Sequence, residues 1–134
     1  MDRGVELMRD ARTIAVVGVS DRPSRDSYDV ALYLIGAGYE VYLVNPAIEG
    51  ELLGRPVYDR VQDLPVPVDI VDIFRRPELV MPHVEDAVAA GAKTVWMQLE
   101  IVNEEAAAVA RAAGLEVVMD LCTKIEHQRL PAGA

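Results

Sequence analysis

Short apolar runs rich in β-branched residues alternate along this chain with segments whose apolar residues recur at helical spacing. The first run, residues 14–19, contains no polar side chain, which is typical of a strand covered on both faces of a sheet. Similar runs predict four more strands, at residues 40–44, 68–74, 94–98 and 116–119. Since helical segments separate these strands, the pattern predicts βαβ units and a parallel sheet.

Glycine and proline mark where the helical segments begin and end. The first helix follows a turn-rich segment and ends at Gly36. A second helix, over residues 77–90, opens with a proline, and an alanine-rich third helix spans residues 103–113. A short extended piece is expected at residues 56–58, before a short helix. The tail from about residue 126 has no pattern, so we expect it to be irregular.

Together these elements predict an α/β fold: a Rossmann-like doubly wound parallel sheet of about five strands with helices on both faces. The strand order 3-2-1-4-5, which is common for such sheets, would place the first strand at the centre. The chain has 134 residues, of which 51% are apolar, so it is long enough to bury an ordinary core. We therefore expect a single domain over residues 1–134.

Charge and cysteine content narrow the classes of function. The 13 basic and 22 acidic residues give 13 − 22 = −9, which opposes nucleic-acid binding because that binding relies on clustered Lys and Arg. No apolar run approaches the ~20 residues of a membrane helix, so no membrane role is expected. A single cysteine excludes an intrachain disulfide and a multi-cysteine metal site. The charged start also lacks a signal-peptide apolar region, and we expect a cytoplasmic protein.

Basic side chains gather in the loops that follow the predicted strands. In an open parallel sheet, ligands bind at the edge formed by the carboxyl ends of the strands. Four of the 13 basic residues follow the first and third strands, namely Arg22, Arg25, Arg75 and Arg76. Guanidinium groups beside a helix amino terminus favour an anion, so we expect a phosphorylated small ligand. The alternative is that these arginines only solvate loops or pair with nearby acidic residues.

The glycine pattern separates this edge from ordinary dinucleotide sites. A Gly-x-Gly-x-x-Gly fingerprint that starts at Gly18 would need glycine where this chain has Ser20 and Pro23. The second strand is followed by Asn45 and Pro46 rather than by an acid that binds ribose. NAD(P) binding is therefore a less favoured alternative. A P-loop nucleotide hydrolase is disfavoured because the sequence has no Gly-Lys-Ser/Thr loop.

Five short motifs at this edge occur in the order found in a known family. They are Val17-Gly18-Val19-Ser20, Val44-Asn45-Pro46, Val71-Asp72-Ile73-Phe74-Arg75, Trp96-Met97-Gln98-Leu99 and Met119-Asp120-x-Cys122-x-Lys124-Ile125-Glu126. Together they resemble the small stand-alone CoA-binding proteins, which are similar to the amino-terminal domain of the succinyl-CoA synthetase alpha subunit. The resemblance covers roughly residues 5–127, and five ordered motifs are far more specific than one glycine loop.

The resemblance implies that the domain holds coenzyme A, as free CoA or an acyl-CoA, at the carboxyl edge of the sheet. With the basic loops, it points to contacts from Gly18, Val19, Ser20, Arg22, Ser24, Arg25, Asn45, Pro46, Phe74, Arg75, Met97, Gln98 and Cys122. One position departs from the family, because Ile48 stands where the synthetase has a CoA-binding lysine; Arg75 or Arg76 is the candidate substitute. The 3′-phosphate of CoA favours arginine where an NAD ribose favours a carboxylate.

Few side chains at this edge could carry chemistry. The resemblance implies that Cys122 can face the CoA thiol, although a buried, inert cysteine is the more common case. His83 lies within a predicted helix and His127 in the tail, and nothing pairs either with Cys122. Asp69 and Asp72, three positions apart in one strand, face opposite sides, which makes them a poor catalytic pair. No cluster has the spacing of metal ligands, so we assign no metal.

Two hypotheses therefore remain. The favoured one is a non-catalytic module that binds CoA or an acyl-CoA, and the alternative is a redox or acyl-transfer enzyme that uses Cys122 on the CoA thiol or thioester. The synthetase's phosphorylated histidine belongs to a further domain, so the resemblance implies no ligase activity for these residues alone. The apolar content is compatible with a homodimer or an unidentified protein partner.

Overall fold

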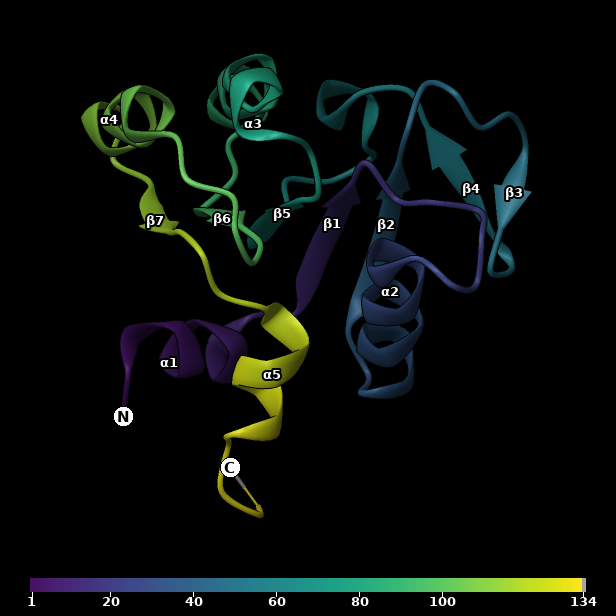
Figure 1. The fold of residues 1–134 in the computed structure, drawn as a ribbon, viewed down its shortest axis with the longest axis horizontal. Helices are drawn as coiled ribbons and strands as arrows, with labels where there is room; N and C mark the ends of the chain where they lie inside the picture. Colours follow the sequence, from purple (N-terminus) through teal and green to yellow (C-terminus); the bar gives the residue numbers. More distant parts are fainter. Residues whose placement is uncertain (134) are drawn as a thin grey trace.

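The computed structural model describes residues 1–133 as a seven-stranded sheet between two layers of helices (Figure 1). The strands are β1 (Thr13–Val17), β2 (Glu40–Val44), β3 (Glu51–Leu52), β4 (Arg55–Tyr58), β5 (Ile70–Ile73), β6 (Thr94–Met97) and β7 (Glu116–Val118). The helices are α1 (Arg3–Asp10), α2 (Asp26–Gly36), α3 (Met81–Ala89), α4 (Glu104–Ala112) and α5 (Thr123–Gln128), with 3₁₀ turns η1 (Val61–Asp63) and η2 (Pro77–Leu79). Helices α1, α2 and α5 cover one face and α3 and α4 the other, which confirms the α/β Rossmann-like fold.

The strand order is β3-β4-β2-β1-β5-β6-β7, and all neighbouring pairs are parallel except the antiparallel pair β3 and β4. The predicted order of five strands, 3-2-1-4-5, is wrong in this detail. The third predicted strand, β5, pairs with β1 at the centre, while β4 lies beyond β2. The short extended piece expected at residues 56–58 is confirmed as β4, but it was not counted among the five strands of the predicted order. Pro56 is tolerated there because only the two residues of β3 pair with β4 on its outer side.

Two helices at the chain ends were not predicted. Helix α1 precedes the first strand, and α5 begins at Thr123 and extends into the tail that was expected to be irregular from about residue 126. A six-residue helix is marginal by itself, so α5 depends on tertiary contacts, which bury Thr123 and Glu126. Locally, Glu126 also accepts a hydrogen bond from Arg129 at 2.7 Å. The helix expected over residues 77–90 begins as the 3₁₀ turn η2. Within residues 1–133, no helix is long and apolar enough to cross a membrane.

The core lies on both sides of the sheet, as expected for parallel strands covered on both faces. Below α3 and α4 it contains Val71, Ile73 and Val95, and below α1, α2 and α5 it contains Ile70 and Trp96. The Trp96 indole is fully buried and donates to the Leu121 carbonyl at 2.8 Å. This contact fixes the segment after β7 against the sheet and so sets where α5 begins.

Candidate functional site

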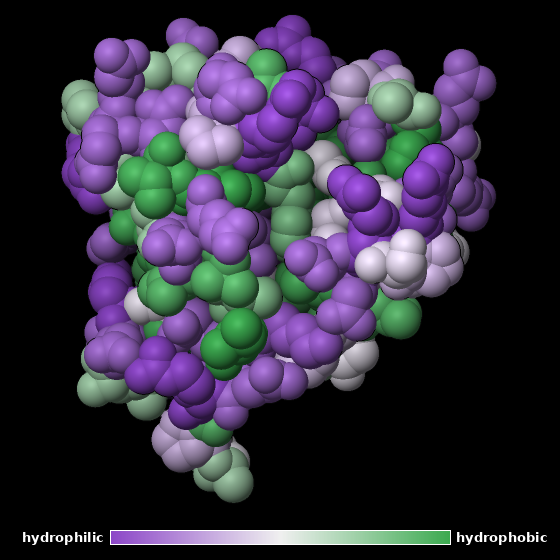
Figure 2. Space-filling view, viewed as in Figure 1, coloured by the Kyte–Doolittle hydropathy of each residue, from purple (hydrophilic) through white to green (hydrophobic). Residues whose placement is uncertain are grey.

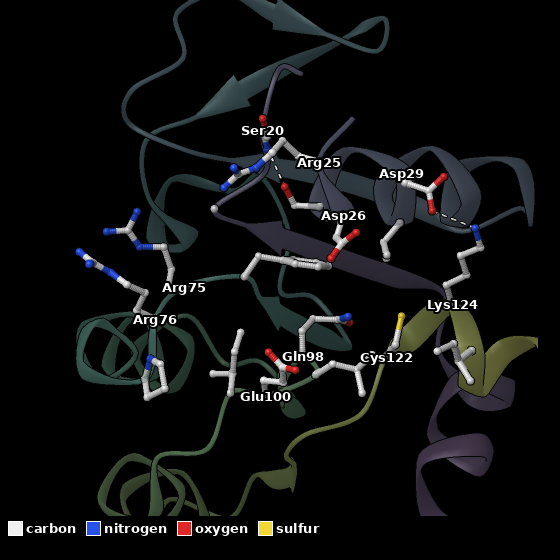
Figure 3. Close-up of a pocket in the computed structure, with 18 of the residues that line it drawn as sticks. Ser20, Arg25, Asp26, Asp29, Arg75, Arg76, Gln98, Glu100, Cys122 and Lys124 are labelled. Carbon is white, nitrogen blue, oxygen red and sulfur yellow. Dashed lines mark hydrogen bonds and ion pairs between the residues drawn. The ribbon is translucent and has the colours of Figure 1, made fainter. Parts of the chain in front are cut away.

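A cleft of about 810 Å³ opens at the carboxyl edge of the sheet (Figure 3). The loop after β1, the start of α2 and the segments after β5, β6 and β7 surround it. Its volume falls within the range of roughly 300–1,000 Å³ that is usual for small-molecule sites. The fold therefore places a cleft of ligand size at the edge where open parallel sheets bind their ligands.

The turn after β1 allows two segments of the wall to meet. Gly18 has a φ of 81°, in the left-handed region that favours glycine, and its N–H donates to the Val44 carbonyl at 2.9 Å. A Cβ at this position would overlap the carbonyl oxygen of Phe74 and crowd the side chain of Arg75. Glycine is therefore required for the loop after β1 to lie against the segment after β5.

Side-chain hydrogen bonds hold the loop between β1 and α2. The N–H of Ser20 donates to Ser27 Oγ at 2.9 Å, and Ser20 Oγ accepts the N–H of Arg22 at 3.0 Å. Asn45 Nδ2 donates to the Val19 carbonyl at 2.8 Å, which ties the end of β2 to the same loop. These contacts orient the first turn of α2 so that it borders the cleft. The backbone N–H groups of this turn, which have no partner within the helix, therefore lie beside the cleft.

Three guanidinium groups gather at one end of the cleft (Figure 3). Arg25 immediately precedes α2, and Arg75 and Arg76 follow β5. Among residues 1–133, Arg25 and Arg75 form no ion pair, while Arg76 has only a long one of 3.5 Å with Glu78, both side chains being exposed. The positive charge at this end, which we call the arginine end, is therefore available to an anion beside the α2 amino terminus.

The opposite end of the cleft contains Cys122 and Lys124 (Figure 3). Lys124 donates to Asp29 at 2.8 Å, and this hydrogen bond raises the pKa of the lysine. Its Nζ also lies 5.4 Å from the centroid of the Tyr33 ring. Cys122 is buried apart from 7% of its surface, and Gln98 reaches toward it from the end of β6. A thiol and an amide thus border what we call the thiol end.

A buried polar cluster lies behind the thiol end. Gln98 Oε1 is 3.0 Å from both the N–H nitrogen and the hydroxyl oxygen of Thr123. The same hydroxyl lies 2.8 Å from Asp72 Oδ2. Burial raises the pKa of the Asp72 carboxyl well above its usual range, and the hydrogen bond with Thr123 opposes this shift only in part. A carboxyl group in this setting favours its neutral form.

The structure brings together eight of the thirteen residues predicted for the site. Those that line the cleft are Gly18, Ser20, Ser24, Arg25, Phe74, Arg75, Gln98 and Cys122. Val19 and Met97 are instead fully buried in the core, and Asn45 braces the first loop. Arg22 and Pro46 are exposed and lie outside the cleft lining.

Sequence reasoning missed several residues of the lining. Asp26, Asp29 and Val30 lie on α2, whose cleft-facing side carries no distinctive pattern. Ile101 lines the cleft after β6. Lys124 belongs to one of the family-like motifs, but no helix was predicted over residues 123–128, so nothing placed this side chain at the cleft. The motif itself was the available signal.

Neither histidine lines the cleft. His83 is on α3, where burial lowers its pKa and the charge of Arg75 adds to the shift. His127 lies on α5 and its Nδ1 is 2.7 Å from the Tyr33 hydroxyl. Across residues 1–133, no three acidic, histidine or cysteine side chains are grouped to hold a metal ion.

A family model, a protein sequence and a solved structure each match nearly the whole of this chain. The CoA binding domain family model matches residues 12–128. Uncharacterized protein YneT of Bacillus subtilis is 40% identical over 122 residues, which cover 91% of this chain and 90% of that protein. A hypothetical protein from Pyrococcus horikoshii OT3 has a similar structure, with a TM-score of 0.91, 43% identity and coverage of 95% of this chain and 89% of that one.

A larger relative contains the same fold as one part. The dinucleotide-forming acetyl-coenzyme A synthetase 1 of Ca. Korarchaeum cryptofilum, solved with phosphate and ADP, matches with a TM-score of 0.69 and 29% identity. The match covers 79% of this chain and 25% of the synthetase. Since the family match spans nearly all of the sheet and of the cleft lining, this chain belongs to the CoA binding domain family.

Proposed function

We propose that this chain binds CoA or an acyl-CoA in the cleft as a non-catalytic module. The observation that carries the proposal is that one cleft has three guanidinium groups at one end and a thiol and an amide at the other. CoA is itself a molecule with phosphates at one end and a pantetheine arm ending in a thiol at the other. The family supports the same ligand.

The arginine end suits the phosphates. Arg25 and Arg75 are the candidate partners, because guanidinium groups make paired, charge-assisted hydrogen bonds to phosphate oxygens. The backbone N–H groups at the start of α2 are further donors for a phosphate, because no side chain of residues 1–133 caps this end of the helix. Arg75 and Arg76 come from the loop after β5, so they can supply the charge that the family lysine would bring at the Ile48 position.

The thiol end suits the pantetheine arm. Leu99 and Ile125 also line the cleft and remain about half exposed, at 50% and 46%. In the space-filling view, hydrophobic residues gather near the middle of this face and polar residues surround them (Figure 2). An aliphatic arm with amide groups would cover these apolar side chains, and their burial contributes to affinity.

The chemistry of the lining favours binding over catalysis. The histidines of residues 1–133 lie outside the cleft, so Cys122 has no imidazole base beside it there. Lys124, the nearest cation in sequence, is held by Asp29. The lining therefore supplies contacts for a ligand rather than an activated nucleophile with a paired base.

Calorimetric titration of the whole chain with CoA, acetyl-CoA, NAD and ATP tests the proposal. We expect saturable binding of CoA, acetyl-CoA or both, and no comparable binding of NAD or ATP. Binding of NAD or ATP without CoA would contradict it. The Arg111→Ala variant is a matched control, since Arg111 is an exposed arginine on α4, away from the cleft lining.

The position of Cys122 in the lining favours one second candidate, thiol chemistry with CoA. In that reaction the Cys122 and CoA thiols would each lose a hydrogen to an oxidant such as hydrogen peroxide and join as a disulfide. Mass spectrometry after mild oxidation with CoA would reveal the adduct, and Cys122→Ser is the control. If the wild-type protein stays unmodified, and the Cys122→Ser variant binds CoA as well as wild type does, then thiol chemistry is contradicted and the non-catalytic binding module is the function that stands.

A further inference from the structure

One buried polar cluster lies among the mainly apolar residues at the centre of the sheet. Asp72 is fully buried on β5, and its register partners, Val16 on β1 and Trp96 on β6, are both apolar. Its Oδ1 has no hydrogen-bond partner among residues 1–133, and its Oδ2 meets only the Thr123 hydroxyl. A buried carboxyl with a single partner is costly for stability if ionised. A role in ligand binding would explain why this carboxyl is buried beneath the cleft.

The orientation of the neighbouring Gln98 amide follows from a backbone donor. The Thr123 N–H, which can only donate, lies 3.0 Å from the terminal group of Gln98. The atom that faces it must be the amide oxygen, because a flipped amide would set two donors against each other. Gln98 Nε2 then makes no hydrogen bond within residues 1–133, and the residue lines the cleft. Gln98 is thus left with two free N–H donors at the thiol end.

Counting protons in the cluster then decides the state of Asp72. The Thr123 hydroxyl has one proton but lies within hydrogen-bond distance of two acceptors, Gln98 Oε1 at 3.0 Å and Asp72 Oδ2 at 2.8 Å. If Asp72 were ionised, one of these short contacts would be between two oxygens with no proton between them. If Asp72 is neutral, it donates to Thr123, which donates to Gln98, and both contacts are hydrogen bonds.

The surroundings of Asp72 are consistent with a neutral carboxyl. Burial raises its pKa, and no charged group offsets the shift. Strands β1 and β6 carry no titratable side chain. On α5 and the residue before it, the titratable groups are Cys122, Lys124, Glu126 and His127; the last three are engaged by Asp29, Arg129 and Tyr33. No cation is therefore aimed at Asp72 to hold it ionised.

We propose that Asp72 acts as a neutral carboxylic acid and positioning residue, which with Thr123 fixes the Gln98 amide so that its N–H groups bind a ligand carbonyl oxygen. The ligand part rests on the proposed CoA function. CoA species offer that carbonyl from two sources, the pantetheine amides that all of them share and the thioester that only an acyl-CoA has. Gln98 would therefore be a specificity-determining contact at the thiol end.

The state of Asp72 can be measured in the wild-type protein without ligand. We expect the ¹³C shift of the Asp72 carboxyl to keep its neutral-acid value from about pH 5 to about pH 7, where ordinary aspartates are ionised. An ionised shift across this range would overturn the proposal. This measurement does not depend on CoA binding, so it separates the inference about Asp72 from the proposed function.

Variants then test the positioning role. Gln98→Met keeps the side-chain length without donors and should weaken binding about fivefold, the usual effect of losing one neutral hydrogen bond. Asp72→Val should weaken binding to a similar extent. Asp72→Asn should rescue it to within about twofold, because the Asn amide can donate to Thr123 as a neutral acid does. Equal binding by wild type and Gln98→Met, or equal losses for Asp72→Val and Asp72→Asn, would overturn the proposal.

Parallel titrations with CoA and acetyl-CoA identify the carbonyl. If Gln98→Met weakens both ligands equally, the contact is to a pantetheine amide, whereas a loss confined to acetyl-CoA assigns it to the thioester. A wild-type protein that binds neither ligand would overturn the proposed function and the carbonyl contact together. Circular dichroism of each variant confirms that the fold is retained, and the wild-type carboxyl shift stands as the test if Asp72→Val does not fold.

Discussion

The two ends of the cleft are built in opposite ways. At the arginine end, the charged groups of Arg75 and Arg76 lie on exposed side chains whose positions are set by loops. At the thiol end, Gln98 and Cys122 are almost wholly buried, and Thr123 and Asp72 hold Gln98 from behind. One end presents exposed charge to solvent, while the other presents an amide that is held from within the core.

From this contrast we infer that the two ends would serve different tasks when a CoA species binds. Exposed arginines attract a phosphorylated ligand from a distance and adapt to it, but salt screens them. A buried amide acts only on a group that reaches it, and it discriminates strongly because an unmatched buried donor is costly. We infer that the arginine end contributes mainly to capture and the thiol end to selectivity.

The largest expected effect comes from breaking the turn that supports both ends. Gly18→Ala should lower the free energy of unfolding by about 3 kcal/mol, because it combines a left-handed backbone with an overlap on the Phe74 carbonyl. Urea denaturation measures this loss. Gly50→Ala is the matched control: Gly50 has a φ of 82° but nothing within 4 Å of an added Cβ, so about 1 kcal/mol is expected. Equal losses would refute the role of the close approach.

A smaller effect is expected from removing one hydroxyl at the thiol end. Thr123→Val keeps the volume but leaves the buried Asp72 carboxyl without its one hydrogen-bond partner among residues 1–133, so we expect a loss of about 2 kcal/mol in unfolding free energy. Thr94→Val is the control, because Thr94 is also buried but its hydroxyl makes no side-chain hydrogen bond within residues 1–133. A Thr123 variant as stable as the Thr94 variant would contradict the network.

The pH dependence of stability reports the same network. Because the pKa of Asp72 is raised in the folded protein, the unfolded chain binds fewer protons above the ordinary value of 3.8, and stability falls as pH rises toward the folded value. The slope from this one group is at most about 1.4 kcal/mol per pH unit. Asp72→Asn should remove that decline. Parallel stability curves for the two proteins between pH 4 and pH 7, recorded by chemical denaturation, would show that Asp72 is not neutral.

The smallest effect is expected at the arginine end. Arg25→Ala should weaken CoA binding about fivefold and reduce its dependence on salt, without changing stability measurably. Titrations at low and high salt measure both quantities, with Arg111→Ala as the unaffected control. If Arg25→Ala binds CoA as wild type does at low salt, Arg25 does not contact the phosphates.

The sequence predicted the central strands well because buried parallel strands are continuous apolar runs, as residues 14–17 illustrate. The short extended piece expected at residues 56–58 is confirmed as β4, but its place beyond β2 could not be read from the sequence. The sequence failed at α5, where local signals are weak and the helix depends on contacts such as the burial of Thr123. The same distinction holds for the cleft: loop residues next to strands were found, whereas Lys124 and the role of Thr123 depend on where a six-residue helix packs.

The sheet also contains a built-in optical reporter. Trp96 is the single tryptophan of the chain, it is fully buried, and its indole N–H is bonded to Leu121, the residue before Cys122. Indole emission is sensitive to hydration and to hydrogen bonding at the ring nitrogen, so fluorescence from this one side chain follows the docking of the Cys122 segment. Ligand entry and detachment of that segment would therefore be observable without any added label.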